Sequence, residues 1–356
     1  MTTYVDPAGK LFGHLDRLAG LKAGHVPPPV NVEIDLSNRC SLGCEWCHFS
    51  YTHTRGPLAG KTPKPEGDVP GGDLMPLALA RRIIRQLRTY GVRSITWTGG
   101  GEPTLHPDFD EIVTYAAAVG IKQGIYTHGG HIDAERAALL KRVMTFVYVS
   151  LDAICAKDYK HRKRVDRFDA ATDGVRRLAD AEGGATLGVG FLLGPESWPD
   201  AYSAPRLVED LKADYCQFRP AIIYGQEHPG ELAENAEWVD DAITAMRFSI
   251  SRHDNVEADI PRFQRYRDWR GHGYATCWWS GLQTVITPNG KVWACVNLRE
   301  HPAAELGDLS VESFEDIWRS RPLHAVDHDC RIMCRGHIPN LALDAMMAPR
   351  EHAEFV

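Results

Sequence analysis

The sequence has 356 residues, which is enough for one large domain and a smaller one. Hydrophobic residues make up 44% of the chain and charged residues 24%, as in ordinary globular proteins. A formal net charge of -7 gives no electrostatic reason to expect nucleic acid or an anionic membrane surface as the main partner. The composition therefore favours a substrate that is small or recognised locally.

Residues 1–30 are expected to be a short lead-in that ends in a stiff run of three prolines. They contain no uninterrupted apolar stretch of the signal-peptide type, and no later stretch has the length of a membrane span. We therefore expect a cytoplasmic protein without membrane contact. Its nine cysteines then indicate metal binding or catalysis, because disulfide frameworks belong to secreted chains.

A cysteine-rich loop follows the first predicted strand directly. Cys40, Cys44 and Cys47 stand in this loop at C-x3-C-x2-C spacing. Thiolates are the ligands of iron-sulfur clusters, and three of them can hold three irons of a 4Fe-4S cube. The fourth iron would keep an open position, as reactive metal sites do. On these residues alone, a Cys3His zinc site that includes His48 is the alternative.

Beyond this loop, strands and helices are expected to alternate. Residues 49–73 are rich in Gly and Pro and predict a long loop that acts as a lid. Counted with the run at 32–36, about six strand–helix units extend to residue 222, which implies parallel βαβ connections. The predicted fold is an α/β barrel or open barrel with its chemistry at the carboxyl ends of the strands. Further strands are expected at 94–97, 124–127, 146–151, 185–193 and 215–222, and helices at 133–143, 169–182 and 202–213.

The turn after the second predicted strand contains three glycines followed by an acid, with Gly100, Gly101 and Glu102 as its key residues. Glycine lets the backbone approach a ligand closely. The carbonyls of this turn and the Glu102 carboxylate can accept hydrogen bonds from an ammonium group. A glycine run is more often only a tight turn, so its position beside the cysteine loop carries the interpretation.

The other strand ends hold further candidates. These are His128 after the third strand, Ser150 and Asp152 after the fourth, Glu196 after the fifth and Arg219 on the sixth. The simpler interpretations are a solvated turn histidine, a capping pair and a structural ion pair, while Glu196 is a candidate acid or base. Cys155, just past the fourth strand, is a candidate hydrogen donor, whereas strand alternation places Cys216 on the opposite face from Arg219.

A second cysteine pattern occupies the C-terminal segment. Cys277 and Cys295 flank a predicted hairpin with a Pro-Asn-Gly turn, and Cys330 and Cys334 follow in the sequence CRIMC. Four thiolates from a hairpin and a later loop can enclose one further 4Fe-4S cluster completely. A zinc ribbon is the alternative for the same residue types.

The two cysteine patterns and the glycine turn together resemble the radical S-adenosylmethionine (radical SAM) superfamily with a C-terminal SPASM or twitch extension. With Trp46, the triad is similar to the family signature C-x3-C-x-aromatic-C, and the turn resembles the GGE motif that holds the SAM amino group. One further cysteine pair favours the shorter twitch form with a single auxiliary cluster. The resemblance implies a partial (β/α)6 barrel over 31–225, a helical connector over 226–275 and a twitch/SPASM-like domain over 276–356.

The resemblance also implies roles for single residues. Cys40, Cys44 and Cys47 would hold the SAM-binding 4Fe-4S cluster, and Cys277, Cys295, Cys330 and Cys334 the auxiliary one. The residues expected at SAM are Trp46, Gly100, Gly101, Glu102, Ser150, Asp152 and Arg219, the last at the methionine carboxylate. His128 stands where the family's TNG turn has Asn, and is with Glu196 and Cys155 a candidate catalytic residue.

On this resemblance, an electron from a flavodoxin- or ferredoxin-type donor cleaves SAM to methionine and a 5'-deoxyadenosyl radical, which takes hydrogen from a substrate carbon. The expected enzyme is a radical SAM oxidoreductase or lyase of natural-product, for example antibiotic, biosynthesis. Its expected substrate is a small carbohydrate- or aminocyclitol-like metabolite that undergoes dehydrogenation, epimerisation or decarboxylation. A pool of histidines and carboxylates and the lack of a peptide-recognition domain before residue 30 favour this substrate class.

Three alternatives remain at this point. The first is a maturase that crosslinks or oxidises a ribosomal peptide. The second is a molybdenum-cofactor cyclase, although the C-terminal tail lacks the Gly-Arg-Arg ending expected of that family. The third is a non-catalytic iron-sulfur or zinc scaffold, which the intact glycine turn beside an intact cysteine triad disfavours.

Overall fold

A computed structural model describes residues 4, 6, 8–47, 74–221, 236–299, 301–326, 330, 334–349 and 351–352 of the protein. The loop expected at 49–73, the zinc alternative's His48 and residues 226–235 of the expected connector lie outside the described residues. Among the helices of the described stretches, none combines the length and apolar character needed to cross a lipid bilayer.

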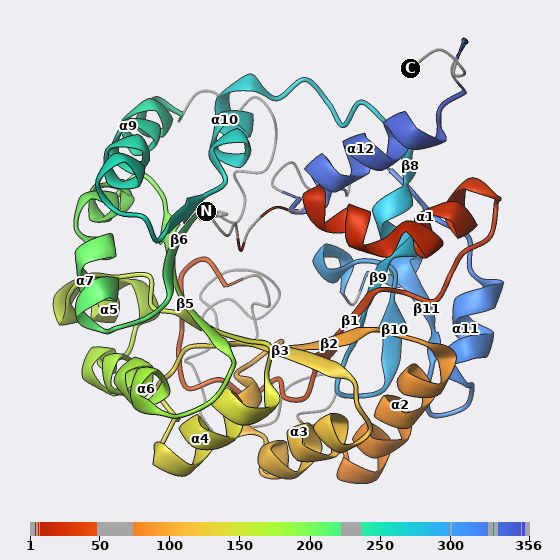
Figure 1. Ribbon diagram of the computed structural model, residues 1–356, viewed down its shortest axis with the longest axis horizontal. Coiled ribbons are helices and arrows are strands. Elements are labelled where there is room, and N and C mark those ends of the chain that lie inside the picture. Colours follow the sequence, from red (N-terminus) through yellow and green to blue (C-terminus); the bar gives the residue numbers. More distant parts are fainter. Residues whose placement is uncertain are drawn as a thin grey trace.

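In the described part of the chain, a ten-stranded sheet curves into an open barrel with helices along its outer side (Figure 1). Its order is β11-β10-β9-β1-β2-β3-β4-β5-β6-β7, and all neighbours from β9 to β7 run parallel. The strands are β1 (Asn31–Asp35), β2 (Ser94–Thr98), β3 (Lys122–Thr127), β4 (Phe146–Ser150), β5 (Thr186–Leu193), β6 (Tyr215–Pro220), β7 (Val256–Ala258), β9 (Gln283–Ile286), β10 (Lys291–Trp293) and β11 (Glu305–Asp308). A separate pair consists of β8 (Thr276–Cys277) and β12 (His324–Ala325).

The helices connect successive parallel strands or frame the C-terminal strands. They are α1 (Leu15–Lys22), α2 (Leu77–Tyr90), α3 (Phe109–Ala118), α4 (Ala134–Val143), α5 (Ala156–Lys163), α6 (Phe168–Asp180), α7 (Ala204–Asp210), α9 (Glu237–Arg252), α10 (Ile260–Asp268), α11 (Phe314–Ser320) and α12 (His337–Met347). The six predicted parallel strands and the C-terminal hairpin are confirmed. The expected helix at 202–213 is instead a 3-10 segment, Trp198–Tyr202, followed by the short α7.

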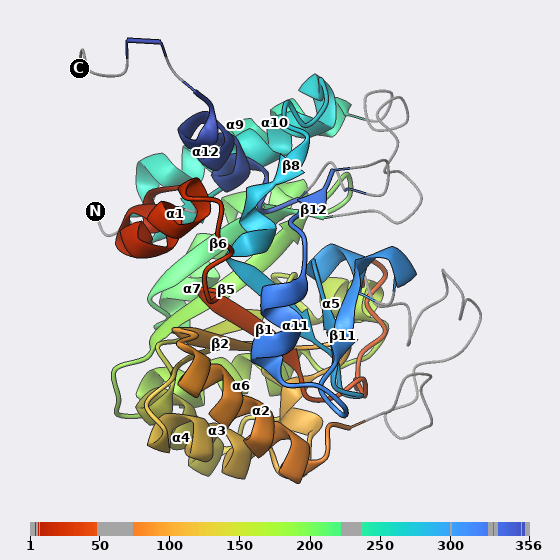
Figure 2. The ribbon, with the colours of Figure 1, turned by 90° about the vertical axis from the view of Figure 1, so that its right-hand side faces the viewer.

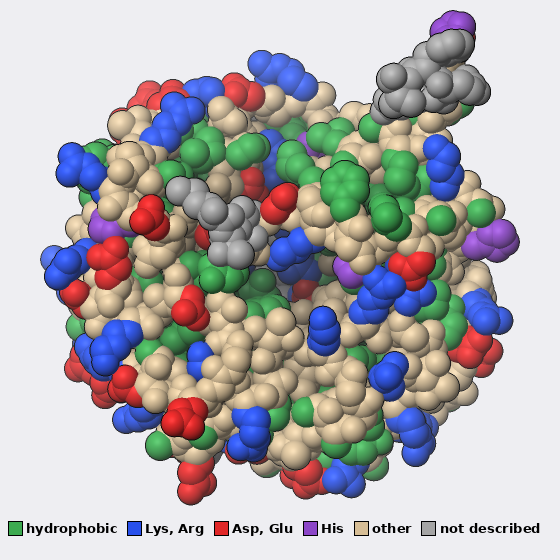
Figure 3. Space-filling model, viewed as in Figure 1, with side chains coloured by type: hydrophobic (Ala, Val, Ile, Leu, Met, Phe, Trp, Pro, Cys, Tyr) green, Lys and Arg blue, Asp and Glu red, His purple; other side chains and the backbone are tan. Residues whose placement is uncertain are grey.

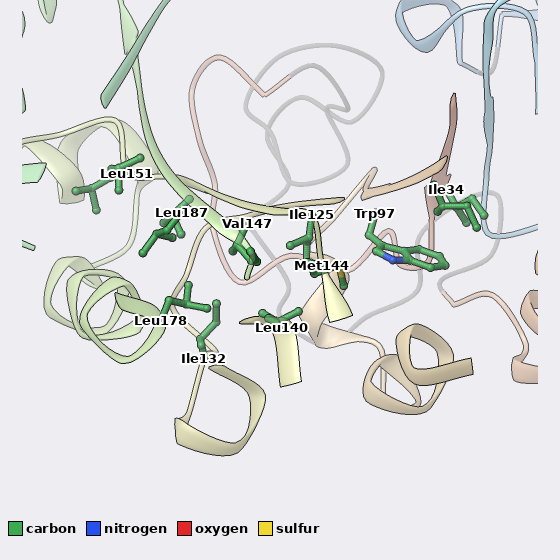
Figure 4. Close-up of a cluster of buried hydrophobic side chains, with 14 of the residues drawn as sticks. Ile34, Trp97, Ile125, Ile132, Leu140, Met144, Val147, Leu151, Leu178 and Leu187 are labelled. Carbon is green, nitrogen blue, oxygen red and sulfur yellow. The ribbon is translucent and has the colours of Figure 1, made fainter. Parts of the chain in front are cut away.

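The main core lies between the outer side of the sheet and the helices. Ile34, Trp97 and Ile125 project from successive strands toward this layer, where Leu140 of α4 and Leu178 of α6 meet the sheet (Figure 4). Each fully buried side chain of this size contributes about 1.5–3 kcal/mol. Because neighbouring strand residues face opposite sides, the alternate positions point into the barrel, whose inner side we call the lumen.

Helix α5 was not predicted, because its sequence AKDYKHRK is dominated by charged residues and carries no apolar stripe. The lead-in of residues 1–30 is also helical in part. Leu18 and Leu21 of α1 form a small cluster with Leu343 of α12, so the two ends of the chain pack together (Figure 2). Part of the expected lead-in therefore packs against the C-terminal helix α12.

Candidate functional site

The cysteine loop at the end of β1 is held by the backbone of α5. The Gly43 amide donates to the Lys163 carbonyl at 2.9 Å, and the Glu45 amide to the Arg162 carbonyl at 3.2 Å. Burial raises the pKa of the Cys40 thiol well above its ordinary value, and the nearby Cys44 and Cys47 add to this effect. The three half-buried thiols therefore lie near one another. They suit a cationic metal centre, since ligation removes their protons.

The glycine turn is locked onto the same loop. The Gly101 amide donates to the Ser37 carbonyl at 2.9 Å, and the Glu102 amide to the Arg39 carbonyl at 2.8 Å. A Cβ atom on Gly101 would lie 2.1 Å from the Arg39 carbonyl oxygen, so no other residue fits there. The glycine motif and the cysteine triad thus form one structural unit at the ends of β1 and β2.

Glu102 connects this unit to β3. Its Oε1 accepts from the hydroxyls of Thr104 at 2.7 Å and Thr127 at 2.6 Å, and its Oε2 accepts from the His128 amide at 2.9 Å. Burial alone would raise the pKa of Glu102, but His128 and these hydrogen bonds lower it. The carboxylate therefore stays ionised. Its Oε1 is filled, because it also accepts from the Thr104 amide at 3.2 Å, whereas Oε2 keeps capacity for a ligand's ammonium group.

His128 is buried and is not a solvated turn residue, since only 6% of its surface is exposed. Its Nδ1 accepts from the Gly130 amide at 3.0 Å, and its Nε2 lies 3.1 Å from the Ser41 hydroxyl. The same hydroxyl lies 2.9 Å from Nε2 of His131. A hydrogen-bonded chain thus joins the turn after β3 to the cysteine loop. Burial lowers the pKa of His128 to about 4, so the ring is neutral at neutral pH.

The buried His128 predicts a loss of stability in acid. Its folded pKa of about 4 lies below the ordinary value of 6.5, so the unfolded chain takes up a proton first as the pH falls between these values. This difference corresponds to about 3 kcal/mol at ~1.4 kcal/mol per pKa unit. Urea unfolding of the wild type is therefore expected at lower urea near pH ~5 than near pH ~7, and His128→Asn is expected to reduce that shift. Equal shifts in both proteins would contradict the prediction.

Lys163 is a functional candidate that sequence reasoning missed. It is buried, forms an ion pair with Asp152 and donates to the Ser150 carbonyl at 3.3 Å. Its Nζ also lies 5.9 Å from the ring centre of Trp46. Burial lowers the pKa of Lys163, but Asp152 and the Cys44 thiolate outweigh it and raise the pKa above its usual range. The run of basic residues in the last turn of α5 was the signal that could have revealed it.

Ser150 and Asp152 lie at the end of β4 as expected, but they already serve Lys163. The Asp152 carboxylate also accepts from the Leu192 amide at 2.8 Å, and the residue takes a left-handed conformation with φ of 60°. Its position next to the cysteine loop is therefore fixed by β5 and α5 together.

A cavity of ≈ 350 Å³ opens beside the cysteine loop, between Trp46 and the segment that follows β5. Glu196 lies on its rim, with 81% of its side chain exposed and its Oε2 3.5 Å from Nε2 of His161. Cys155 is exposed and donates to Asp158 at 3.2 Å. The structure thus separates the three residues proposed as catalytic, because His128 lies inside and the other two lie at the surface.

Arg219 points into the lumen from β6. Its guanidinium carbon lies 4.6 Å from the ring centre of Tyr148 and 5.7 Å from that of Tyr126. No carboxylate among the described residues forms an ion pair with it, so the structural ion pair considered for Arg219 is wrong within this part of the chain. Cys216 is fully buried on the outer side of β6, as strand alternation predicts.

A buried ion-pair network joins β1 to the C-terminal strands. Arg299 lies 3.1 Å from Glu33 and 2.8 Å from Asp35, and Arg335 also pairs with Glu33. Both carboxylates point into the lumen, because they alternate with the apolar residues of the strand. This alternation of acidic and apolar residues in the sequence VEIDL could have indicated a polar lumen. It could not have indicated the arginines that pair with the two acids.

The four C-terminal cysteines come together although they lie on three segments. Burial raises the pKa of Cys295 to about 12, and Cys334 and Cys330 add to this effect, while the same neighbours also raise that of Cys277. Backbone amides at residues 297 and 336 donate to the sulfur atoms of Cys295 and Cys334 at 3.4 and 3.3 Å. In the described ranges, no three His, Cys, Asp or Glu side chains are placed around a single metal ion. Four thiolates are the ligands that an iron-sulfur cluster requires.

Comparison with known proteins gives two family matches. The model of the radical SAM superfamily matches residues 34–202, and the model of the iron-sulfur cluster-binding SPASM domain matches residues 277–336. Two curated relatives and one solved structure illustrate the similarity.

Fe-coproporphyrin III synthase of Methanosarcina barkeri is 29% identical over 193 residues, which are 54% of this chain and 44% of that protein. PqqA peptide cyclase of Xanthomonas campestris is 32% identical over 104 residues, which are 29% of this chain and 23% of that protein. The matched region thus spans less than half the length of either relative. The crystal structure of SuiB of Streptococcus suis bound to precursor peptide SuiA has a similar fold, with a TM-score of 0.62 at 17% identity, and the match covers 90% of this chain and 71% of that one.

Proposed function

This chain combines a radical SAM domain with an iron-sulfur cluster-binding SPASM domain, and from that premise we propose that it modifies a peptide by radical chemistry. The two domains imply a SAM-binding 4Fe-4S cluster, an auxiliary cluster and SAM. The peptide replaces the small carbohydrate-like metabolite as the preferred substrate. It is supported by the similarity to PqqA peptide cyclase and by a fold like that of the peptide-bound SuiB.

The observation that carries this choice is the state of the acidic groups around the lumen. A small polar metabolite was favoured because of a pool of carboxylates and histidines. In the described residues these carboxylates already have partners within the protein. Glu33 and Asp35 pair with arginines, Glu102 accepts hydrogen bonds from threonines and His128, and Asp152 pairs with Lys163. The lumen instead offers the tyrosine rings and Arg219, which suit a larger, partly apolar substrate such as a peptide.

The residues present fit the cofactors. Cys40, Cys44 and Cys47 would hold the first cluster, and the four C-terminal cysteines the auxiliary one. When bound, the first cluster and SAM supply a one-electron reductive cleavage that yields a 5'-deoxyadenosyl radical able to take hydrogen from a substrate carbon. A reductant is required, and we propose a flavodoxin- or ferredoxin-type donor.

The chain's own side chains bind and orient SAM. The carbonyls of Gly100 and Gly101 and the Glu102 carboxylate face the ammonium group, which an ionised carboxylate holds well. Trp46 presents its ring to the cavity of ≈ 350 Å³ and would stack on the adenine there. Lys163 places a positive charge beside the cysteine loop and would pair with the methionine carboxylate of SAM.

The position of the auxiliary cysteines favours an oxidising role for the second cluster. The loops that carry Cys295 and Cys334 also carry Arg299 and Arg335, which reach into the lumen and pair with β1. A peptide in the lumen would therefore lie between the two cysteine sites. We propose that the modification is an oxidation or crosslink. We also propose the domain bounds that the sequence predicts: a barrel over 31–225, a connector over 226–275 and an auxiliary domain over 276–356.

The proposal is tested with the anaerobically reconstituted chain and synthetic peptides copied from any short reading frames that flank its gene. We expect dithionite to drive formation of 5'-deoxyadenosine, and the peptide mass to fall by about two hydrogens per oxidation or crosslink. Both changes should disappear with Cys40→Ala. SAM cleavage without any change in the peptide, together with turnover of a sugar-like metabolite, would refute the peptide assignment.

A further inference from the structure

Arg219 is a cation at the lumen without an acidic partner of its own among the described residues. Its buried Nε has no hydrogen-bond acceptor there. Asp152 is the nearby acid that favours its charge, but Asp152 is engaged by Lys163. The rings of Tyr148 and Tyr126 lie beside the guanidinium, and Tyr215 also acts on its charge. A guanidinium withdrawn from water without a counter-charge costs free energy that a bound anion restores.

The molecule is open toward the lumen on one side. The face seen in Figure 3 is hollowed near its centre and shows Lys or Arg side chains inside the hollow.

Arg219 lies near the first cysteine site. Asp152 acts on its charge, and Lys163, the ion-pair partner of Asp152, stands beside Cys44. A substrate that is attacked near the first cluster therefore passes this place.

We propose that Arg219 binds a carboxylate of the substrate peptide, either an Asp or Glu side chain or the C-terminal carboxylate. This inference rests on the proposed peptide function. An arginine fork binds a carboxylate through two parallel hydrogen bonds, and the tyrosine rings beneath Arg219 limit its hydration. The site replaces the expectation that Arg219 binds the methionine carboxylate of SAM, because the cation beside the cysteine loop is Lys163.

The test is ligand-observed NMR saturation transfer on the SAM-loaded, cluster-reconstituted chain. The probes are acetyl-Gly-Glu-Gly-amide, acetyl-Gly-Gly-Gly with a free C-terminal carboxylate, acetyl-Gly-Gln-Gly-amide and glutarate. We expect one of the acidic peptides to bind at least about tenfold more tightly than the Gln peptide, since a charge-assisted bond contributes ~1.4 kcal/mol or more. Which acidic peptide binds distinguishes a side chain from the C-terminus.

Arg219→Gln is expected to remove this preference, and Arg219→Lys to weaken it because Lys lacks the planar fork. Arg206→Gln is the matched control, since this exposed arginine pairs with Asp210 on the surface of α7. Unchanged acidic binding in Arg219→Gln with iron content intact would overturn the site. So would loss of the SAM-dependent change in the cluster's electron paramagnetic resonance signal, which would assign Arg219 to SAM. Arg219-dependent binding of glutarate alone would support the carboxylate site while removing the peptide.

A different observation concerns Arg321, next to the auxiliary cysteines. Its side chain is 6% exposed, and its Nε and Nη1 have no hydrogen-bond partner in the described residues. Nη2 donates to the Ser280 carbonyl, whose own hydroxyl donates to the Cys277 carbonyl at 2.6 Å. The guanidinium also stacks 3.6 Å from the ring centre of Trp318. Burial lowers its pKa to about 9, and the Cys277 thiolate acts in the opposite direction.

We infer that Arg321 is the counter-charge of the auxiliary cluster and raises its reduction potential. Four thiolates leave a 4Fe-4S cluster negatively charged, and nearby charge sets its potential. Arg321→Gln is expected to lower the midpoint potential, by about 59 mV for each tenfold loss in the reduction equilibrium. Arg321→Lys should retain most of the effect, because it keeps the charge.

The potential is measured by a redox titration followed by electron paramagnetic resonance, in a chain that also carries alanine at Cys40, Cys44 and Cys47. Only the auxiliary cluster is then present. Arg319→Gln is the control, since this arginine is exposed on α11 and pairs with Glu315. An unchanged potential in Arg321→Gln with about four irons per chain would overturn the inference.

Discussion

Replacing Cys40, Cys44 and Cys47 together by alanine is expected to abolish SAM cleavage and to reduce iron from about eight to about four per chain. The physical reason is that the triad supplies the thiolates of the site-open cluster, while the C-terminal cysteines form a separate set. Anaerobic iron and sulfide quantitation measures the stoichiometry. Electron paramagnetic resonance with and without SAM identifies the cluster that binds the cofactor.

Cys216→Ala is the matched control for the triad. This cysteine is fully buried on the outer side of β6, away from both sets, so its loss should leave iron near eight per chain. Four irons in the wild type and none in the triple variant would mean that the C-terminal cysteines hold no cluster. The oxidising role proposed for the auxiliary domain would then fail.

Asp35→Asn is expected to destabilise the protein by about 2 kcal/mol or more, below the ~3–5 kcal/mol of a fully broken buried ion pair, because Arg299 loses Asp35 but keeps Glu33. Asp35 is fully buried and Arg299 nearly so, and their closest atoms are 2.8 Å apart. Anaerobic urea unfolding of the wild type and the variant measures the loss. A double variant with Arg299→Leu is expected to recover part of it, because the incompletely neutralised charge is then removed.

The exposed pair of Arg176 and Asp173 on α6 is the control for this prediction. Its atoms are 2.9 Å apart, but both side chains are about half exposed, so Asp173→Asn should cost less than ~1 kcal/mol. Equal losses at the two sites would show that the network beneath the auxiliary domain is not the buried support that its geometry indicates.

The alternation of strands and helices was predictable because it follows from the local spacing of apolar residues. Ala80, Ile83 and Leu87 recur at helical spacing, and all three are buried on the inner face of α2. Helix α5 was not predicted because its sequence is mostly charged and has no apolar stripe. Tyr159, Arg162 and Lys163 of this helix are nevertheless buried. Its importance arises from the cysteine loop that its backbone holds.

The individual site residues divide in the same way. Glu102 lies beside the cysteine loop as expected, but its hydrogen bonds to Thr127 and His128 come from β3. Glu196 was chosen for its place after β5, and the structure puts it on the rim of a cavity with most of its surface exposed. The position of a residue along a strand predicted which end of the barrel it lies at. It did not predict which partner neutralises the charge of its side chain.

The sequence by itself determined the chemistry of this protein: two sets of thiolates, their spacing, and a glycine turn beside the first set. Ligand type and short-range spacing are local properties, so they can be read without a fold. Only the tertiary structure decided which charges are satisfied. Arg299 pairs with Asp35, 264 residues away in the sequence, and Arg335 pairs with Glu33, 302 residues away. Such pairings depend on how the sheet curves. That curvature leaves Arg219 and Arg321 without acidic partners among the described residues, and so indicates where anions bind.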